Sequence, residues 1–277
     1  MNAPARPVLR YHGGKWKLAP WIIEHLPPHR VYTEAYGGAA SVLIRKPRSY
    51  GEVYNDLDGE LVNLFRVLQD PTSGARLREL LYLTPFARAE FELVYESVED
   101  PVERARRLVI ACYMGFGSNG HNTSTRTGFR ANSNRSGTTP AHDWANYPDC
   151  LPAIVERLRG VVIDSKPALN LITQHDGAET LHYVDPPYVH VTRDRGGARQ
   201  RDYRHEMADD DHRKLAGVLR GVRGMVVLSG YPCDLYDREL YPDWKRVQRA
   251  HFADGARPRT EVLWLNQSAS AAQRCLL

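Results

Sequence analysis

The chain has 277 residues, a formal net charge of +4, and 42% hydrophobic and 25% charged residues. These values are typical of a soluble globular protein, and the length accommodates one large α/β domain with an insertion. No apolar run approaches the roughly 20 residues of a membrane span, and residues 1–7 lack the apolar segment of a signal peptide. We therefore expect a cytoplasmic protein with no membrane partner. The mild positive charge permits nucleic-acid binding without requiring it.

The cysteine and histidine residues argue against a metal site. Four cysteines are widely separated, so no C-x-x-C pair is available for a structural zinc ion. None of the eleven histidines belongs to an H-x-x-x-H pair with a matching acid. We expect reduced thiols and no bound metal.

The first sixty-eight residues alternate between helical and strand-like patterns. We expect helices over Lys17–Leu26, Ala39–Arg45 and Leu57–Leu68, and short strands over Val31–Tyr36 and Glu52–Tyr54. This order is typical of the opening of a doubly wound sheet with helices on both faces.

The composition changes twice in the rest of the chain. A charged, helical stretch from Pro71 to Arg107 continues with an apolar face to Met114, and Gly115 to Trp144 is then rich in Gly, Ser, Asn, Thr and Arg. So long a polar segment inside a compact domain is either functional or disordered. Regular patterns return with a helix over Asp209–Arg220 and with strands over Val161–Asp164, Leu181–Val184, Met225–Ser229 and Glu261–Asn266.

The most informative motif follows the predicted strand Leu181–Val184 and reads Asp185-Pro186-Pro187-Tyr188. Two prolines fix the backbone and remove two N–H donors, so a carboxylate and a carbonyl stand side by side as acceptors. Together they can accept both hydrogens of one exocyclic amino group, and the Tyr188 ring can stack on a planar heterocycle. The motif is suited to holding a nucleobase, although a proline turn with a packed tyrosine is the structural alternative.

Two glycines separate a predicted strand from a predicted helix in the segment from Glu34 to Ser41. Gly37 and Gly38 allow a tight turn and a close approach to a ligand, although a purely structural turn is an equal alternative. Asp56 follows the next strand about twenty residues later, where an acid binds the ribose hydroxyls of a nucleoside cofactor. Asp58 is nearby, and its side chain can cap the following helix instead.

A further glycine turn lies near the N-terminus, in Tyr11-His12-Gly13-Gly14-Lys15. Lys15 is a point charge suited to a carboxylate or a phosphate. The alternative is an ordinary solvated lysine beside a loop.

Taken in order, these motifs resemble those of the Dam-type DNA adenine N6-methyltransferases, whose cofactor is S-adenosylmethionine. Val227 to Gly230 and Glu261 to Asn266 resemble later strands of that family, so the resemblance spans most of the chain, in the alpha order of motifs. It implies a Rossmann-like class I methyltransferase sheet, with residues 1–68 and 151–277 as the catalytic domain. Residues 69–150 would be an inserted target-recognition region. The first motif has Tyr11-His12 where Dam proteins often have Trp-Ala.

The resemblance also implies roles for individual residues. The catalytic group would consist of Asp185, Pro186, Pro187 and Tyr188. The cofactor-binding group would consist of Tyr11, Lys15, Glu34, Tyr36, Gly37, Gly38, Ala39, Asp56 and Asp185. In this interpretation the target adenine leaves the DNA stack, because a stacked base cannot present its amino group to the methyl donor.

The polar segment and the loop after the catalytic motif supply the predicted contacts to double-stranded DNA. Arginine can recognise guanine and asparagine can recognise adenine, whereas contacts to phosphate position the protein without specifying sequence. The predicted DNA-binding residues are Asn119, His121, Asn122, Arg126, Arg130, Arg135, Arg193 and Arg195, with Arg130 as the first choice for a base contact.

Two other functions are compatible with parts of this sequence. A methyltransferase of the same fold could act on RNA or on a protein amide, although such relatives more often have Asn in place of Asp185. A DNA-binding relative without catalysis is the second alternative, and the intact Asp185, Asp56 and Lys15 argue against it. We expect a monomer, and a restriction endonuclease is one candidate partner.

Overall fold

The computed structural model describes residues 4–116, 126–132, 134, 137–193, 204–253 and 257–274. The chain forms two compact units, each assembled from three segments. Unit 1 comprises Met1–Ala19, Gly38–Lys46 and Asp58–Ile163, and unit 2 comprises Pro20–Gly37, Pro47–Leu57 and Asp164–Leu277. The assignment of residues 69–150 to target recognition is a statement about function, and it stays a prediction.

Unit 2 contains most of a mixed seven-stranded sheet with the order β3-β2-β1-β4-β5-β7-β6. The strands are β1 (Val31–Glu34), β2 (Gly51–Asn55), β3 (Val161–Asp164), β4 (Thr180–Val184), β5 (Met225–Gly230), β6 (Lys245–Ala253) and β7 (Arg257–Leu265). Strand β1 runs parallel to β2 and β4, and β4 runs parallel to β5. Strand β7 is antiparallel to β5 and β6. The α/β fold class with a Rossmann-like sheet is therefore confirmed.

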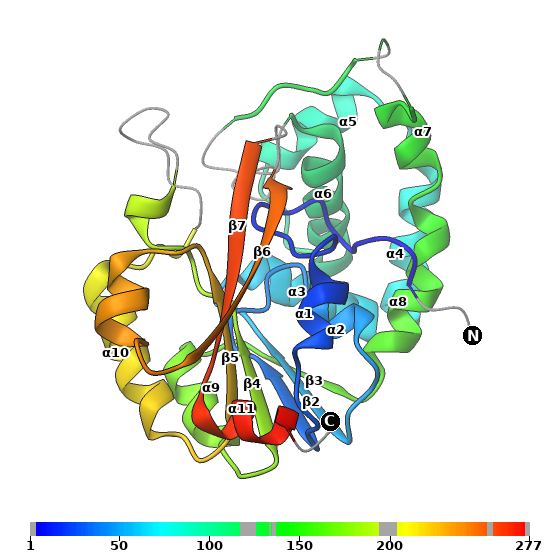
Figure 1. Ribbon diagram of the computed structural model, residues 1–277. Coiled ribbons are helices and arrows are strands. Elements are labelled where there is room, and N and C mark those ends of the chain that lie inside the picture. Colours follow the sequence, from blue (N-terminus) through cyan, green and yellow to red (C-terminus); the bar gives the residue numbers. More distant parts are fainter. Residues whose placement is uncertain are drawn as a thin grey trace. The chain divides into compact units, whose positions relative to one another are not determined.

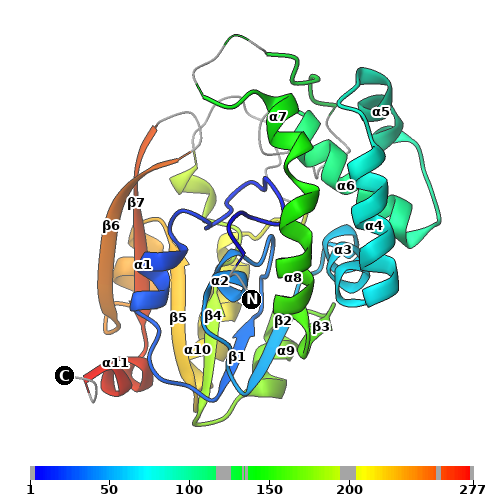
Figure 2. The ribbon, with the colours of Figure 1, turned by 90° about the vertical axis from the view of Figure 1, so that its right-hand side faces the viewer.

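Helices cover the sheet of unit 2. The helical elements of this unit are α9 (Ala168–His175), η3 (His190–Thr192), α10 (Asp209–Gly221), the π-helix η4 (Leu235–Leu240) and α11 (Gln267–Arg274). Figure 1 shows α9 and α10 on the same side of the sheet, where Leu171, Leu215 and Leu219 share one core with Val184 and Trp264. Figure 2 shows α11 beside the lower ends of β5 and β7.

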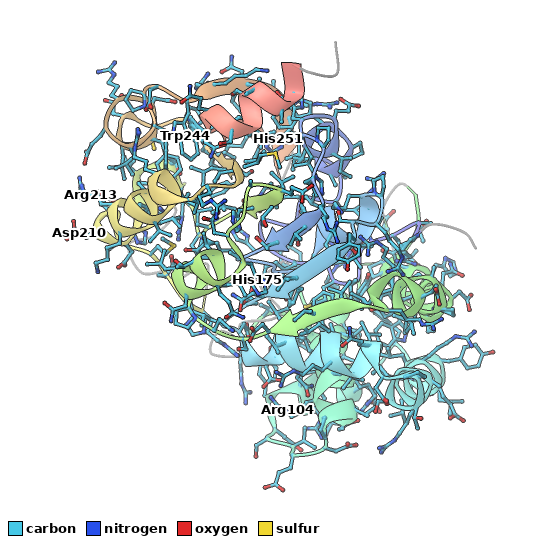
Figure 3. All side chains as sticks on the ribbon, turned by 90° about the horizontal axis from the view of Figure 1, so that it is seen from below. Arg104, His175, Asp210, Arg213, Trp244 and His251 are labelled. Carbon is cyan, nitrogen blue, oxygen red and sulfur yellow. The ribbon has the colours of Figure 1, made fainter. Side chains whose placement is uncertain are left out.

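Polar side chains on α10 point away from this core. Arg213 forms ion pairs with Asp210 and with Glu239 of η4, at 3.0 Å and 2.7 Å. Figure 3 shows Arg213 and Asp210 on that helix, on the side away from the strands. The predicted helix over Asp209–Arg220 is thus confirmed, as α10.

Unit 1 is mainly helical. Its helices are α2 (Ser41–Arg45), α3 (Gly59–Gln69), α4 (Pro71–Leu83), α5 (Arg88–Glu92), η1 (Leu93–Tyr95), α6 (Pro101–Met114), α7 (Pro140–Ala145), η2 (Pro148–Cys150) and α8 (Leu151–Leu158). Helices α3, α4, α6 and α8 pack together in this unit. The first helix, α1 (Ala19–Glu24), begins with the last residue of a unit 1 segment and continues in unit 2. It is shorter than the predicted Lys17–Leu26.

The helical stretch predicted from Pro71 onward is broken into separate helices, and two of them, α4 and α6, are started by a capping residue and a proline. Asp70 accepts a hydrogen bond from the Ser73 amide before Pro71, and Asp100 accepts one from the Val102 amide before Pro101. Proline fits the first helical position because that position has no helical partner for an N–H group. The same device, Thr139 before Pro140, starts α7, so the end of the predicted polar loop is helical.

Two histidines are buried in the core of unit 2. His182 on β4 shares a 2.8 Å hydrogen bond with the Thr33 hydroxyl, and His212 on α10 shares a 2.9 Å hydrogen bond with the Tyr236 hydroxyl. Burial lowers the pKa of each imidazole to about 4 from its ordinary value of 6.5. Both side chains are therefore neutral at pH 7.

This burial predicts that acid destabilises the protein. Between about pH 6.5 and pH 4 the unfolded chain binds protons at His182 and His212 that the folded chain excludes, so the free energy of unfolding falls as the pH is lowered. Each histidine should contribute a loss on the order of 1–2 kcal/mol between pH 7.5 and pH 5. Urea denaturation at several pH values measures this slope. A free energy of unfolding that stays constant to pH 5 would contradict the prediction.

Candidate functional site

The candidate site of unit 2 lies at the carboxyl ends of its parallel strands. Strands β2, β1, β4 and β5 are adjacent in that order and run in the same direction, so their last residues meet at one edge of the sheet. Asp185 follows β4 directly, between the segments that leave β1 and β5. Ligands of open α/β sheets bind outside the carboxyl ends of the strands. The predicted catalytic motif is therefore at the edge where this architecture places a ligand.

The turn after β1 is held by backbone and side-chain hydrogen bonds from the end of β2. The Gly37 amide donates to the Asn55 carbonyl at 2.8 Å, and the Asn55 side chain donates to the Ala35 carbonyl at 2.9 Å. The same side chain also bonds both backbone groups of Lys166. A Cβ atom on Gly37 would lie 2.2 Å from the Tyr54 ring, so packing excludes any larger residue from this position.

Unit 1 carries its own part of the predicted cofactor residues. Gly38 has a φ of 49°, in the left-handed region, and a Cβ atom there would lie 3.2 Å from the Tyr11 ring. The Lys15 ammonium donates to the Gly13 carbonyl at 3.0 Å, which closes the N-terminal glycine turn. Ala39 is buried just before α2, which has only five residues, fewer than the predicted Ala39–Arg45.

The two aspartates after β2 have different surroundings. Asp58 is buried at the N-cap of α3 in unit 1, where its carboxylate accepts a 3.0 Å hydrogen bond from the Glu60 amide. Its alternative interpretation as a helix cap is confirmed. Asp56 lies in unit 2 immediately after β2 and is partly exposed. Its position matches that of a ribose-binding acid, and its role stays a prediction.

Two further residues predicted to bind cofactor are engaged with the interior of unit 2. Glu34, the last residue of β1, is 2% exposed and accepts a 2.7 Å hydrogen bond from the Tyr32 hydroxyl. Burial and the adjacent Glu34 carboxylate raise the pKa of Tyr32, so Tyr32 remains a proton donor. Tyr36 packs against the core of α9 and α10, and burial raises its pKa as well.

In the predicted catalytic motif, the side chain of Tyr188 is held by a hydrogen bond to β7. The Tyr188 ring is 7% exposed, and its hydroxyl donates to Glu261 Oε1 of β7 at 2.5 Å. Burial first, and then the neighbouring Asp185 and Glu261 carboxylates, raise the pKa of Tyr188 well above its ordinary value. The phenol therefore stays protonated and donates its hydrogen to Glu261. The Tyr231 ring meets the Tyr188 ring edge-on, with centroids 4.5 Å apart.

Among the predicted DNA-binding residues, three lie in the described parts of the chain. The Arg193 guanidinium donates to the Tyr188 carbonyl at 2.7 Å and forms an ion pair with Glu206 at 2.6 Å. Arg130 donates to the Tyr113 carbonyl of α6 at 3.1 Å, and the Arg126 guanidinium lies 4.9 Å from the centre of the Tyr95 ring. Asn119, His121, Asn122, Arg135 and Arg195 lie outside the described residues.

Three residues that the sequence interpretation assigned no role in the site contact its members. Asn55 bonds the turn after β1, Glu261 bonds Tyr188, and Tyr231 packs against Tyr188. The sequence did contain a signal for Glu261. This carboxylate directly precedes the apolar strand segment Val262–Leu265, and a carboxylate buried in such a strand must have a buried hydrogen-bonding partner. Asn55 belongs to the Tyr54-Asn55-Asp56 motif of the resemblance, which gives it no role of its own. Nothing in the sequence marks Tyr231.

Two features are absent from the residues that the structure describes. No cluster of three or more His, Cys, Asp or Glu side chains suited to a metal ion occurs in these segments. Among the helices within the same segments, none is both long and apolar enough to cross a membrane.

Comparison with known proteins identifies the family. A search of curated proteins finds no match to this sequence. The model of the D12 class N6 adenine-specific DNA methyltransferase family matches residues 11–249, which include the glycine turns, Asp56 and the Asp185–Tyr188 motif. Because the match covers most of the chain, the protein belongs to the D12 class N6 adenine-specific DNA methyltransferases and is an adenine-methylating enzyme that acts on DNA.

Proposed function

We propose that this enzyme methylates adenine at one short DNA sequence, after the base has left the duplex, with Asp185 and the Pro186 carbonyl holding the target amino group. The observation that carries the proposal is the position of Asp185, directly after β4, between two parallel strands at the ligand-binding edge of the sheet. A base inside a duplex cannot reach such an edge, so it must be extruded first.

The acceptors of the motif suit an exocyclic amino group. The Asp185 carboxylate and the Pro186 carbonyl can each accept one N6 hydrogen, and Pro186 and Pro187 contribute no competing N–H. Two accepted hydrogen bonds orient the amino group and draw the nitrogen lone pair out of conjugation with the ring. Tyr188 supplies the aromatic surface against which the adenine stacks. No covalent enzyme intermediate is needed.

The residues of unit 2 fit S-adenosylmethionine as the methyl donor. When bound, this cofactor supplies a methyl group on a positively charged sulfur atom. Asp56, partly exposed after β2, offers a carboxylate for the ribose hydroxyls, and the Gly37 turn lets the backbone approach a ligand closely. Asp185, which bounds the same edge, is proposed to contact the cofactor as well as the base. Tyr11, Lys15, Glu34, Tyr36, Gly38 and Ala39 keep their predicted role as further cofactor contacts.

Residues 69–150 are the proposed target-recognition region, and we expect a cytoplasmic monomer that binds double-stranded DNA. The family assignment favours DNA over the RNA and protein amide substrates considered above. Arg130 donates a hydrogen bond to α6 and Arg193 donates one to Tyr188, so each arginine has a structural role in addition to its proposed contact with DNA.

Methyl transfer from labelled S-adenosylmethionine to unmethylated genomic DNA tests the proposal. Nucleoside analysis should find the label in N6-methyladenine, and mapping should place it in one short sequence. Cofactor binding with no label in DNA would overturn the proposed substrate. Label spread over adenines in all sequence contexts would overturn the proposed specificity.

A further inference from the structure

A buried carboxylate on β7 connects the catalytic motif to the antiparallel part of the sheet. Glu261 is 1% exposed and precedes the buried run Val262–Leu265. Burying a carboxylate in such surroundings is costly unless hydrogen bonds compensate for the lost water. The partners of Glu261 therefore indicate why an acid occupies this position.

Two hydroxyl groups share one oxygen of this carboxylate. Glu261 Oε1 accepts from the Tyr188 hydroxyl at 2.5 Å and from the Ser229 hydroxyl of β5 at 2.6 Å. The other oxygen, Oε2, lies 3.5 Å from His251 Nε2 on β6, a residue labelled in Figure 3. The carboxylate thus joins the loop after β4 to three strands of the sheet.

The tyrosine is held at both ends. Glu261 fixes the hydroxyl end of Tyr188, and Arg193 fixes the backbone end through the Tyr188 carbonyl. Arg193 is itself held by its ion pair with Glu206, and the edge-on ring of Tyr231 limits rotation from the side. A side chain that is ordered before a ligand arrives does not lose its rotational freedom on binding.

We propose that Glu261 is a positioning residue for methyl transfer: it holds the Tyr188 ring in the plane in which the extruded adenine stacks. This inference rests on the proposed stacking role of Tyr188. Glu261 does not touch substrate, and it acts only through the tyrosine hydroxyl. Removal of that hydroxyl and removal of the carboxylate should consequently lower kcat/KM for DNA by the same factor.

The test is a double-mutant cycle with the full-length enzyme, measuring kcat and KM for DNA and the affinity for S-adenosylmethionine. Tyr188→Phe keeps the ring and loses only the hydroxyl, and Glu261→Ala loses the acceptor. Each change should lower kcat/KM for DNA by about tenfold, the size expected for one charge-assisted hydrogen bond. The double variant should be no worse than either single variant, and cofactor affinity should be unchanged.

Two further variants separate positioning from a general structural effect. Glu261→Gln retains an oxygen that can accept both hydroxyls, so it should restore most of kcat/KM. Tyr236→Phe is the matched control, because it removes a buried tyrosine hydroxyl of the same unit that bonds His212 instead. This control should lower the midpoint of thermal unfolding without changing KM for DNA.

The outcomes distinguish this inference from the function on which it rests. Full activity of Tyr188→Phe combined with loss of activity in Tyr188→Ala would overturn the positioning role and leave stacking intact. Full activity of Tyr188→Ala would overturn the stacking role itself. Additive losses in the double-mutant cycle would show that Glu261 acts independently of the tyrosine hydroxyl, which also overturns the inference.

Discussion

Replacing Asp185 by alanine is expected to lower the rate of methyl transfer by about a thousandfold, with little change in DNA affinity. The carboxylate is the only charged acceptor in the Asp185–Tyr188 motif, and without it the amino group loses one of its two proposed hydrogen bonds. Groups that stabilise developing charge in a preorganised site contribute about 10²–10³ in rate, and misplacing the nucleophile adds to this loss. Single-turnover methyl transfer and fluorescence anisotropy of labelled DNA measure the two quantities.

Asp185→Asn is the matched control for this prediction. Its amide oxygen still accepts the hydrogen that Asp185 is proposed to accept, but as a neutral group it forms the weaker hydrogen bond. We expect an activity between those of the native enzyme and of Asp185→Ala. Methyl transfer at the native rate by Asp185→Ala would remove Asp185 from the mechanism.

Replacing Gly37 by alanine is expected to abolish tight binding of S-adenosylmethionine and to destabilise the fold. The new Cβ atom would lie 2.2 Å from Cε2 of the Tyr54 ring, which is fully buried. Either the ring or the turn must shift, at a cost of about 1–3 kcal/mol or more. A shifted turn also breaks the Gly37–Asn55 bond that fixes its position. Isothermal titration with the cofactor and urea denaturation measure both effects.

Gly217→Ala provides the control, because the same methyl group is added in a different environment. Gly217 lies inside α10, and a Cβ atom there meets nothing within 4 Å. Alanine should therefore stabilise the helix by about 0.5–1 kcal/mol and leave cofactor binding unchanged. Cofactor affinity in Gly37→Ala equal to that of this control would contradict the proposed role of the turn.

Several elements of this fold were predictable because their signals are local. The strand Val161–Asp164 and the helix from Asp209 follow patterns of apolar spacing, and the structure confirms both. The strand predicted from Glu261 is β7, which the structure extends back to Arg257. Its partner β6 was not predicted, because Lys245 to Ala253 has only scattered apolar residues among charged and polar ones and no long apolar run.

Helices in the second half were missed for a related reason. Ala168–His175 and Leu151–Leu158 are only eight residues long, too short for a clear helical period. The break between α4 and α6, in contrast, could have been predicted from the sequence, because Asp100 followed by Pro101 is typical of the start of a new helix. At this position the capping residue and the proline indicate the break more directly than the continuous run of charged residues does.

By itself the sequence determined the α/β class, the order of the motifs and the reaction, because those depend on residue type and on which strand each motif follows. An acid, two prolines and a tyrosine after a buried strand already predict a site for an amino group. The tertiary structure alone decided what holds that site in place. The contacts of Tyr188 with Glu261 and of Gly37 with Asn55 join residues 73 and 18 positions apart, and chain separation leaves no local trace of such pairs. Close packing at the carboxyl edge of the sheet brings these residues together, and such a pairing cannot be predicted from the residues next to each of them in the chain.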